Sequence, residues 1–183
     1  MTRRQAIEEV CAPGKPLELK TTQIGGKHLR VFANAPATLR DLYQNNASDL
    51  DFLVYKEERL SYAEVHKQAS SLGMALGQLF HVRRGDRVVI AMRNYPEWVI
   101  AFFAITSIGA IAVPVNAWWN VRELKHSLID CEPKVAIVDE ERLLCLVEID
   151  SLSPDLQIIS TRTDTAISQE YDSWEGIVGF DLD

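Results

Sequence analysis

The longest uncharged run of the sequence lies at residues 98–121. A run of this length is about long enough to cross a bilayer, so it forms either a membrane span or part of a buried core. Gly109 and Pro114 interrupt it, because glycine suits the end of a helix and proline cannot donate to a sheet ladder. We therefore expect a helix over 96–108 and a strand over 110–115, each too short to span a membrane.

The chain around this run alternates between apolar strands and helices. Strands are expected at 52–55, 87–92, 110–115, 135–139 and 156–160, and helices at 61–80, 96–108, 121–130 and 141–149. Strands that are apolar throughout are typical of a parallel sheet covered by helices on both faces. We predict an α/β fold class: a mostly parallel sheet with flanking helices, preceded by an N-terminal β-hairpin over residues 17–32 with its turn at Gly25-Gly26.

The pattern divides the chain into three regions. Residues 1–36 form an N-terminal segment with the β-hairpin, and residues 37–160 form an α/β subdomain. Residues 161–183 have polar stretches, with one amphipathic pattern at Tyr171, Trp174 and Ile177, and we interpret them as a linker or unfinished structure.

The composition argues against several classes of protein. The formal charge is −7, so the chain lacks the clustered cations with which proteins track a nucleic-acid backbone. The three cysteines show no Cys-x-x-Cys spacing and the four histidines are scattered, so we predict neither a disulfide framework nor a metal site. The run Asp139-Glu140-Glu141 suits the positive end of a helix dipole, with a metal site as the alternative. We expect an intracellular, cytoplasmic protein, and spacing alone points to no catalytic residue.

Three stretches follow one another along the chain: LSYAEVHKQASSLGMAL, GDRVVIAMRNYPEWVIAFFAITSIGAIAVPVNAWW and ELKHSLIDCEPKVAIVDEERL. Together they resemble the N-terminal region of the adenylate-forming (AMP-binding) superfamily, most closely its fatty-acyl-CoA synthetases. The resemblance covers roughly Leu39 to Leu146. It implies that the chain is a partial domain of a larger adenylate-forming fold.

Members of this family activate a carboxylic acid with ATP and magnesium to an acyl-adenylate, and then pass the acyl group to the thiol of coenzyme A. The resemblance implies ATP, Mg and coenzyme A as cofactors of the parent protein, and a fatty or other carboxylic acid as its substrate. The phosphate loop, the adenine and aspartate motifs, the hinge and the catalytic lysine of the family have no counterpart in this sequence. We therefore expect the N-terminal fragment of an acyl-CoA ligase, which is not catalytic alone and binds no cofactor tightly. Its expected partners are the remainder of the synthetase and, through exposed apolar surface, further copies of itself.

The resemblance also implies a contact with coenzyme A. In relatives that use this cofactor, the loop after the strand AIAVPV lies close to its nucleotide end, and the matching positions are Asn116, Ala117 and Trp118. We hypothesise that this loop, with Trp119, offers a backbone edge and an indole face to the adenine, while Arg142 reaches a phosphate oxygen. Some relatives carry glycine where this sequence has tryptophan, so the alternative is that both indoles pack a subdomain interface or an acyl channel.

Two other functions stay open at this point. The first is a stand-alone, non-catalytic module that binds an acyl or nucleotide ligand or a partner protein; it gains weight if the tail from Ser160 folds back on the sheet. The second, ranked last, is a membrane-associated protein that uses residues 98–120.

Overall fold

The structure is a computed structural model that describes residues 1–46, 48–164 and 166–179. The chain separates into two compact units, residues 1–42 and residues 43–183. The division falls after residue 42, within α2 (Leu39–Gln44).

The first unit contains the predicted hairpin and one helix that was not predicted. Its elements are α1 (Arg3–Val10), β1 (Leu19–Ile24) and β2 (Lys27–Phe32). The turn of the hairpin is Gly25-Gly26, with φ of 56° and 78°, values that glycine adopts without strain. A capping box begins α1: Gln5 N donates to Thr2 Oγ1, and Thr2 N donates to Gln5 Oε1. No side chain in residues 1–42, all of which are described, is buried.

The second unit is built on a five-stranded parallel sheet, which confirms the predicted α/β fold class. The sheet has the order β6-β5-β7-β8-β9, and the antiparallel pair of β3 and β4 forms a separate hairpin. The strands are β3 (Asp51–Tyr55), β4 (Glu58–Ser61), β5 (Arg87–Ala91), β6 (Ile111–Pro114), β7 (Val135–Asp139), β8 (Gln157–Thr161) and β9 (Asp172–Ser173).

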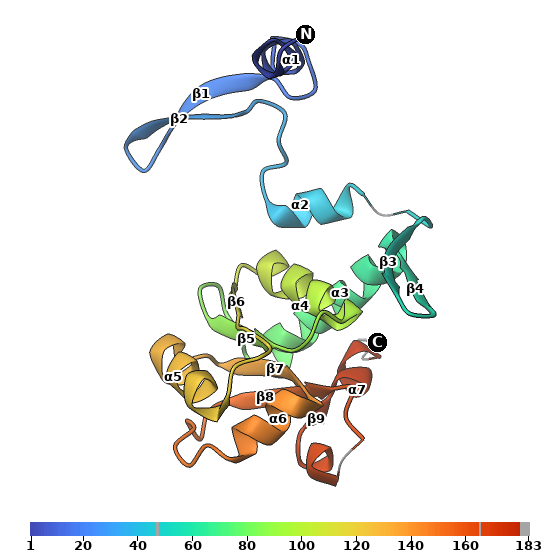
Figure 1. Ribbon diagram of the computed structural model, residues 1–183, viewed down its shortest axis with the longest axis vertical. Coiled ribbons are helices and arrows are strands. Elements are labelled where there is room, and N and C mark those ends of the chain that lie inside the picture. The colour runs from blue at the N-terminus through green and yellow to red at the C-terminus, as the bar shows by residue number, and fades with distance from the viewer. Residues whose placement is uncertain (47, 165, 180–183) are drawn as a thin grey trace. The chain divides into compact units, whose positions relative to one another are not determined.

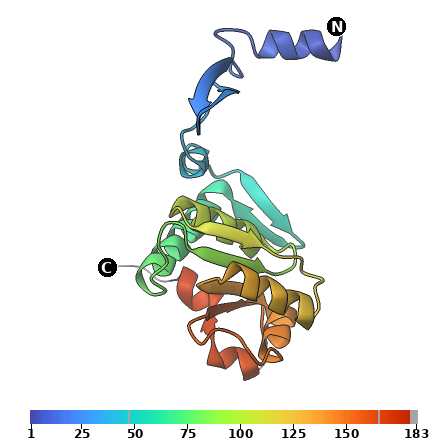
Figure 2. The same ribbon diagram turned by 90° about the vertical axis from the view of Figure 1, so that its left-hand side faces the viewer.

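Helices cover both faces of this sheet, as Figures 1 and 2 show. One apolar cluster lies between the sheet and α3, α4 and α7, and a second lies between the sheet and α5 and α6. All five residues of β7 are buried, as expected for a central strand covered on both faces. The helices are α3 (Tyr62–Gln78), α4 (Pro96–Ser107), α5 (Val121–Cys131), α6 (Glu140–Val147) and α7 (Trp174–Val178), with a 3₁₀ turn at Ala166–Glu170.

The uncharged run at residues 98–121 becomes most of α4, all of β6 and the loop after it. Ala101, Ala104 and Ile105 are completely buried in the first apolar cluster. In the described part of the chain, no helix combines the length and the apolar character that a membrane crossing requires.

The tail that was predicted as a linker or unfinished structure contains ordered elements. β9 pairs with β8 in parallel, and α7 buries Trp174 and Ile177 in the first apolar cluster. The amphipathic hint in the sequence therefore marks a real helix, whose N-cap is Ser173. Residue 165 and residues 180–183 of this predicted region lie outside the described residues.

Candidate functional site at the carboxyl edge of the sheet

The topology of the sheet selects one edge as the place for a ligand. The chain leaves β5 toward β6 on one side, whereas it leaves β7 toward β8 on the other side. Ligands of open parallel sheets bind outside the carboxyl ends of two adjacent strands whose connections diverge in this way. The residues that follow β5 and β7, together with the loop after β6, therefore form the candidate site.

Asp139 is the centre of this edge. It ends β7, serves as the N-cap of α6 and is 2% exposed. Its Oδ1 accepts hydrogen bonds from the backbone N and the Nε of Arg142, at 3.2 and 2.6 Å. Its Oδ2 accepts from the Nη2 of Arg142 at 2.6 Å and from the backbone N of Arg93 at 2.9 Å. One carboxylate thus joins the end of β5 to the start of α6.

Arg142, which the sequence analysis assigned to a phosphate of coenzyme A, is 4% exposed. Its Nη1 donates to the carbonyl oxygen of Ala117 and lies 2.9 Å from a carboxylate oxygen of Glu141. Burial lowers the pKa of Arg142, but its hydrogen bonds and charge interactions with Asp139 and Glu141 together outweigh burial and raise the pKa. Each nitrogen of the guanidinium already donates within the protein, so the side chain braces the loop after β6 rather than pointing to solvent.

In the loop Asn116–Trp119, the Trp118 side chain is exposed to solvent and the Trp119 side chain packs against the protein. Asn116 Oδ1 accepts a hydrogen bond from Trp118 N at 2.9 Å, and Asn116 O accepts one from Trp119 N at 3.1 Å. Trp118 is 75% exposed, whereas Trp119 is half-buried against the second apolar cluster. The Arg93 guanidinium carbon lies 3.6 Å from the centroid of the Trp118 ring, so one face of this indole rests on a cation.

The charges that surround the loop neutralise one another. Arg93 Nη2 donates to the two carboxylate oxygens of Glu141, at 3.0 and 3.3 Å. This hydrogen bond lowers the pKa of Glu141. Two guanidinium groups, of Arg93 and Arg142, thus face two carboxylates, of Asp139 and Glu141. The arrangement offers an aromatic surface rather than a free cationic pocket.

A second charged cluster lies at the same edge, after β8. Arg162 donates from Nε to Glu97 at 3.0 and 3.1 Å, and from Nη1 and Nη2 to Glu58 at 2.9 and 2.7 Å. The same guanidinium lies 5.1 and 4.8 Å from the ring centroids of Tyr55 and Tyr95. It ties the β3–β4 hairpin and the start of α4 to the sheet, and its hydrogen bonds lower the pKa of Glu58.

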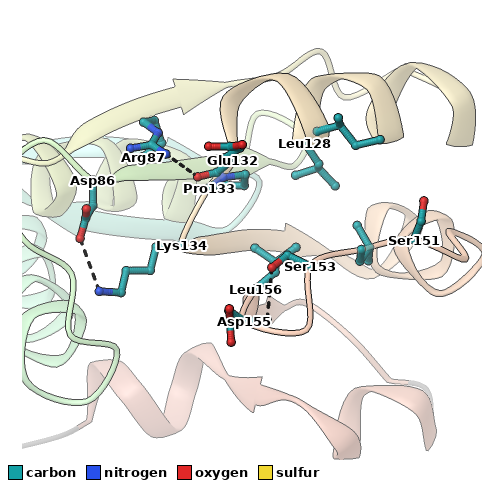
Figure 3. Close-up of a pocket in the computed structure, with 12 residues that line it drawn as sticks. Asp86, Arg87, Leu128, Glu132, Pro133, Lys134, Ser151, Ser153, Asp155 and Leu156 are labelled. Carbon is teal, nitrogen blue, oxygen red and sulfur yellow. Dashed lines mark hydrogen bonds and ion pairs between the residues drawn. The ribbon is translucent and has the colours of Figure 1, made fainter.

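A groove of about 560 Å³ lies at the opposite, amino edge of the sheet, beside the starts of β5, β7 and β8 (Figure 3). Lys134 pairs there with Asp86 at 3.5 Å, and Arg87 donates to the carbonyl oxygen of Glu132 at 2.8 Å. Its two cations are thus engaged in contacts within the protein. None of the site residues predicted from the sequence lines this groove.

The acidic run Asp139-Glu140-Glu141 acts as the start of a helix. Asp139 caps α6, and the carboxylates of Asp139 and Glu141 are engaged by arginines. Within the described residues, no three histidine, cysteine or acidic side chains lie where they could together hold a metal ion.

Comparison with known proteins identifies a family for the chain that carries this site. The model of the AMP-binding enzyme family matches residues 41–178. The chain belongs to the AMP-binding enzymes. This result confirms the resemblance found in the sequence, and the matched region contains the whole of the candidate site.

The chain is also similar to individual CoA synthetases and ligases. Acetyl-coenzyme A synthetase 1 of Pseudomonas aeruginosa is 39% identical over 85 residues, which cover 46% of this chain and 13% of that protein. A long-chain-fatty-acid–CoA ligase of Yersinia pestis is 30% identical over 105 residues, or 56% of this chain and 18% of that protein. The crystal structure of an anthranilate CoA ligase in complex with anthranoyl-AMP has a TM-score of 0.72 and 27% identity, over 80% of this chain and 29% of that chain. The chain thus spans less than a third of each relative.

The structure brings the predicted site residues together but adds partners that the sequence analysis missed. Asn116, Ala117 and Trp118 do lie beside Arg142, whereas Arg93 was not predicted. A signal for Arg93 was available, because it directly follows the apolar run RVVIAM, and residues after parallel strands meet at one edge.

Proposed function

We propose that this chain is the N-terminal part of an ATP-dependent acyl-CoA ligase, which joins a fatty or other carboxylic acid to coenzyme A through an acyl-adenylate. The family match over residues 41–178 carries the proposal. The names of the relatives support it, since they include an acetyl-coenzyme A synthetase and a long-chain-fatty-acid–CoA ligase. The proposal implies an intracellular enzyme, because ATP and coenzyme A are made inside cells.

The chain alone is expected to be inactive. Phosphoryl chemistry needs backbone N–H groups, a cation and a metal ion arranged around the phosphates. The two guanidinium groups at the candidate site are already paired with carboxylates, so they do not fit a triphosphate. Residues beyond this chain would supply the ATP and Mg²⁺ site.

We infer that the loop Asn116–Trp119 binds the nucleotide end of coenzyme A. The exposed indole of Trp118 offers a flat surface on which an adenine can stack, a contact worth about 1–3 kcal/mol per base. Coenzyme A supplies the thiol that accepts the acyl group, and in this proposal the loop contributes only binding and orientation. Arg142 takes no direct part, because its donors are used within the protein.

Two measurements on the natural gene product test the reaction. The first is its denatured mass, compared with the 20.6 kDa of this chain. The second is ATP–pyrophosphate exchange with acetate, a long-chain fatty acid and an aromatic acid. We expect a larger product that exchanges with one of these acids, and no exchange by the isolated chain. A natural product of 20.6 kDa that exchanges with none of them would rule the ligase out.

A stand-alone binding module is the second candidate, and the tail favours it. β9 and α7 fold back on the sheet beside β8 and bury Trp174 against the first apolar cluster. Calorimetric titration of the isolated chain with coenzyme A tests this candidate. Saturable binding to a natural product of 20.6 kDa, without exchange activity, is the result it requires.

The exposed edge of the sheet is the proposed contact with the remainder of the synthetase. β6 is an edge strand, and Ile111 on it is 49% exposed. An uncovered apolar edge promotes association, so the isolated chain is expected to form dimers or larger species in sedimentation velocity experiments. A strict monomer at high protein concentration would contradict this expectation.

A further inference from the structure

The orientation of Trp118 depends on a side chain that does not touch it. Arg142 lies beneath the loop and donates to the carbonyl oxygen of Ala117, the residue before Trp118. Arg142 itself cannot move easily, because it is 4% exposed and both of its other nitrogens bond to Asp139 at 2.6 Å. Turning it away would leave a buried carboxylate without its counter-charge. The backbone of Ala117 is therefore held in a fixed position relative to the sheet.

Asp139 also holds Arg93, the second residue that supports the Trp118 indole. Its Oδ2 accepts the backbone N–H of Arg93, and the side chain of Arg93 covers one face of Trp118. Glu141 holds the far end of the Arg93 side chain through Nη2. The two supports of the loop, one under Ala117 and one against Trp118, thus begin at the same carboxylate.

These contacts reduce the entropy that the exposed Trp118 side chain would otherwise lose when a ligand binds. An exposed aromatic side chain on a loop normally samples several rotamers, and a ligand that stacks on it must first order it. Trp118 is 75% exposed and yet has one face against a guanidinium that is itself anchored at its far end. A held indole with a free face binds a planar ligand with less loss of entropy than a mobile one.

We propose that Asp139 and Arg142 are positioning residues for the loop Asn116–Trp119, which hold Ala117 and Arg93 so that the free face of Trp118 is presented to the adenine of coenzyme A. This inference rests on the proposed function for its ligand, but the positioning of Trp118 is a property of the protein alone. It also gives Arg142 a different role from the phosphate contact expected from the sequence, because Arg142 acts through Ala117.

Arg142→Lys in the full 183-residue chain separates positioning from general stability. Lysine keeps the buried positive charge beside Asp139, but one ammonium group cannot bond both carboxylate oxygens and the Ala117 carbonyl together. The matched control is Arg122→Lys, the same change at an exposed residue of α5. The protein is labelled with 5-fluorotryptophan, and the ¹⁹F resonance of Trp118 is assigned by its loss in Trp118→Phe. Trp98 and Trp174, which pack in the first apolar cluster, report on the fold.

We expect Arg142→Lys to move the Trp118 resonance toward that of a free, solvated indole and to leave the resonances of Trp98 and Trp174 in place. Titration with coenzyme A should show weaker binding, by up to the roughly 5- to 150-fold that loss of one stacked base represents. Trp118→Leu should weaken binding similarly, and Arg142→Lys should add little on top of it. Arg122→Lys should change neither measurement.

The other outcomes decide separately on the positioning of Trp118 and on coenzyme A as the ligand of the loop. An unmoved Trp118 resonance in Arg142→Lys overturns the positioning role, whatever happens to affinity. A moved resonance in a protein that shows no saturable binding of coenzyme A supports positioning and refutes the proposed ligand of the loop. If the resonances of Trp98 and Trp174 move as well, the variant has lost its fold, and Arg93→Met decides instead. That change removes the cation that rests on the indole and that Glu141 holds, and an unmoved Trp118 resonance there overturns the proposal.

Discussion

Replacing Arg142 by methionine and Asp139 by alanine, singly and together, measures how much the buried ion pair matters to the fold. The two residues are 4% and 2% exposed and share two contacts of 2.6 Å. Removal of one partner from such a pair costs about 3–5 kcal/mol, because the other charge stays buried. We expect Asp139→Ala to reach this range, since it strips Arg142 of its carboxylate and also leaves the N–H of Arg93 unpaired.

Arg142→Met should cost less than Asp139→Ala. Methionine keeps an apolar stem of similar length, and Asp139 retains the backbone N–H donors of residues 93 and 142. The double variant buries no unpaired charge, so its cost should lie below the sum of the two single costs by at least about 2 kcal/mol.

Urea unfolding followed by circular dichroism gives the free energies of unfolding, and an unchanged slope with denaturant confirms that the fold is comparable. Lys134→Met is the matched control, because it removes a cation from a half-exposed pair with Asp86, and such pairs contribute about 0–1 kcal/mol. Single costs below about 0.5 kcal/mol, the size of an ordinary surface change, would refute the reasoning. Strictly additive costs would refute it too.

Three further results are expected. Ser61→Ala removes the N-cap of α3 and should lower the free energy of unfolding by about 1 kcal/mol, whereas Ser70→Ala, an exposed change within the same helix, should not lower it. The pKa of Glu58 is lowered by Arg162 in the folded state, so its stabilisation is complete above about pH 4.3 and is lost as pH falls through the folded pKa. Acid titration of Arg162→Gln should therefore show a shallower loss of stability below that pH. Amide hydrogen exchange should be slowest in β7 and fast throughout residues 1–42, where no side chain is buried.

The sheet and its helices were predictable because each element carries its own local signal. Apolar runs mark the central strands, and capping boxes begin α3 at Ser61 and α5 at Asn120. The same signal was present at Thr2 and Gln5, but α1 was not predicted because only three of its eight residues, Ala6, Ile7 and Val10, are apolar. β4 was not predicted because ERLS is polar, and its pairing with β3 depends on contacts distant in sequence.

The site could be predicted only in part, for a physical reason. The sequence places Asn116–Trp119 and Asp139 after strands, which puts both at the carboxyl edge. It does not give the order of the strands, and β7 pairs with β5 rather than with β6, which precedes it in the chain. The contact of Asp139 with the N–H of Arg93 exists only in that order. The use of Arg142 inside the protein depends on Asp139, three residues earlier, and on the carbonyl oxygen of Ala117 in the loop after β6.

The pairing of Arg93 and Arg142 with carboxylates changes the expected salt dependence of coenzyme A binding. The sequence alone suggests free arginines and therefore an affinity that falls with salt. A site in which free cations hold the phosphates of coenzyme A loses affinity as salt is added, because salt screens their attraction. At this loop the cations are paired with Asp139 and Glu141, and the chain as a whole carries a formal charge of −7, which repels an anionic ligand. Screening then weakens a repulsion. Calorimetric titration at increasing salt should therefore show affinity for coenzyme A that stays constant or rises slightly. A steep fall would mean that cations elsewhere carry the binding and that Trp118 is not its main contact.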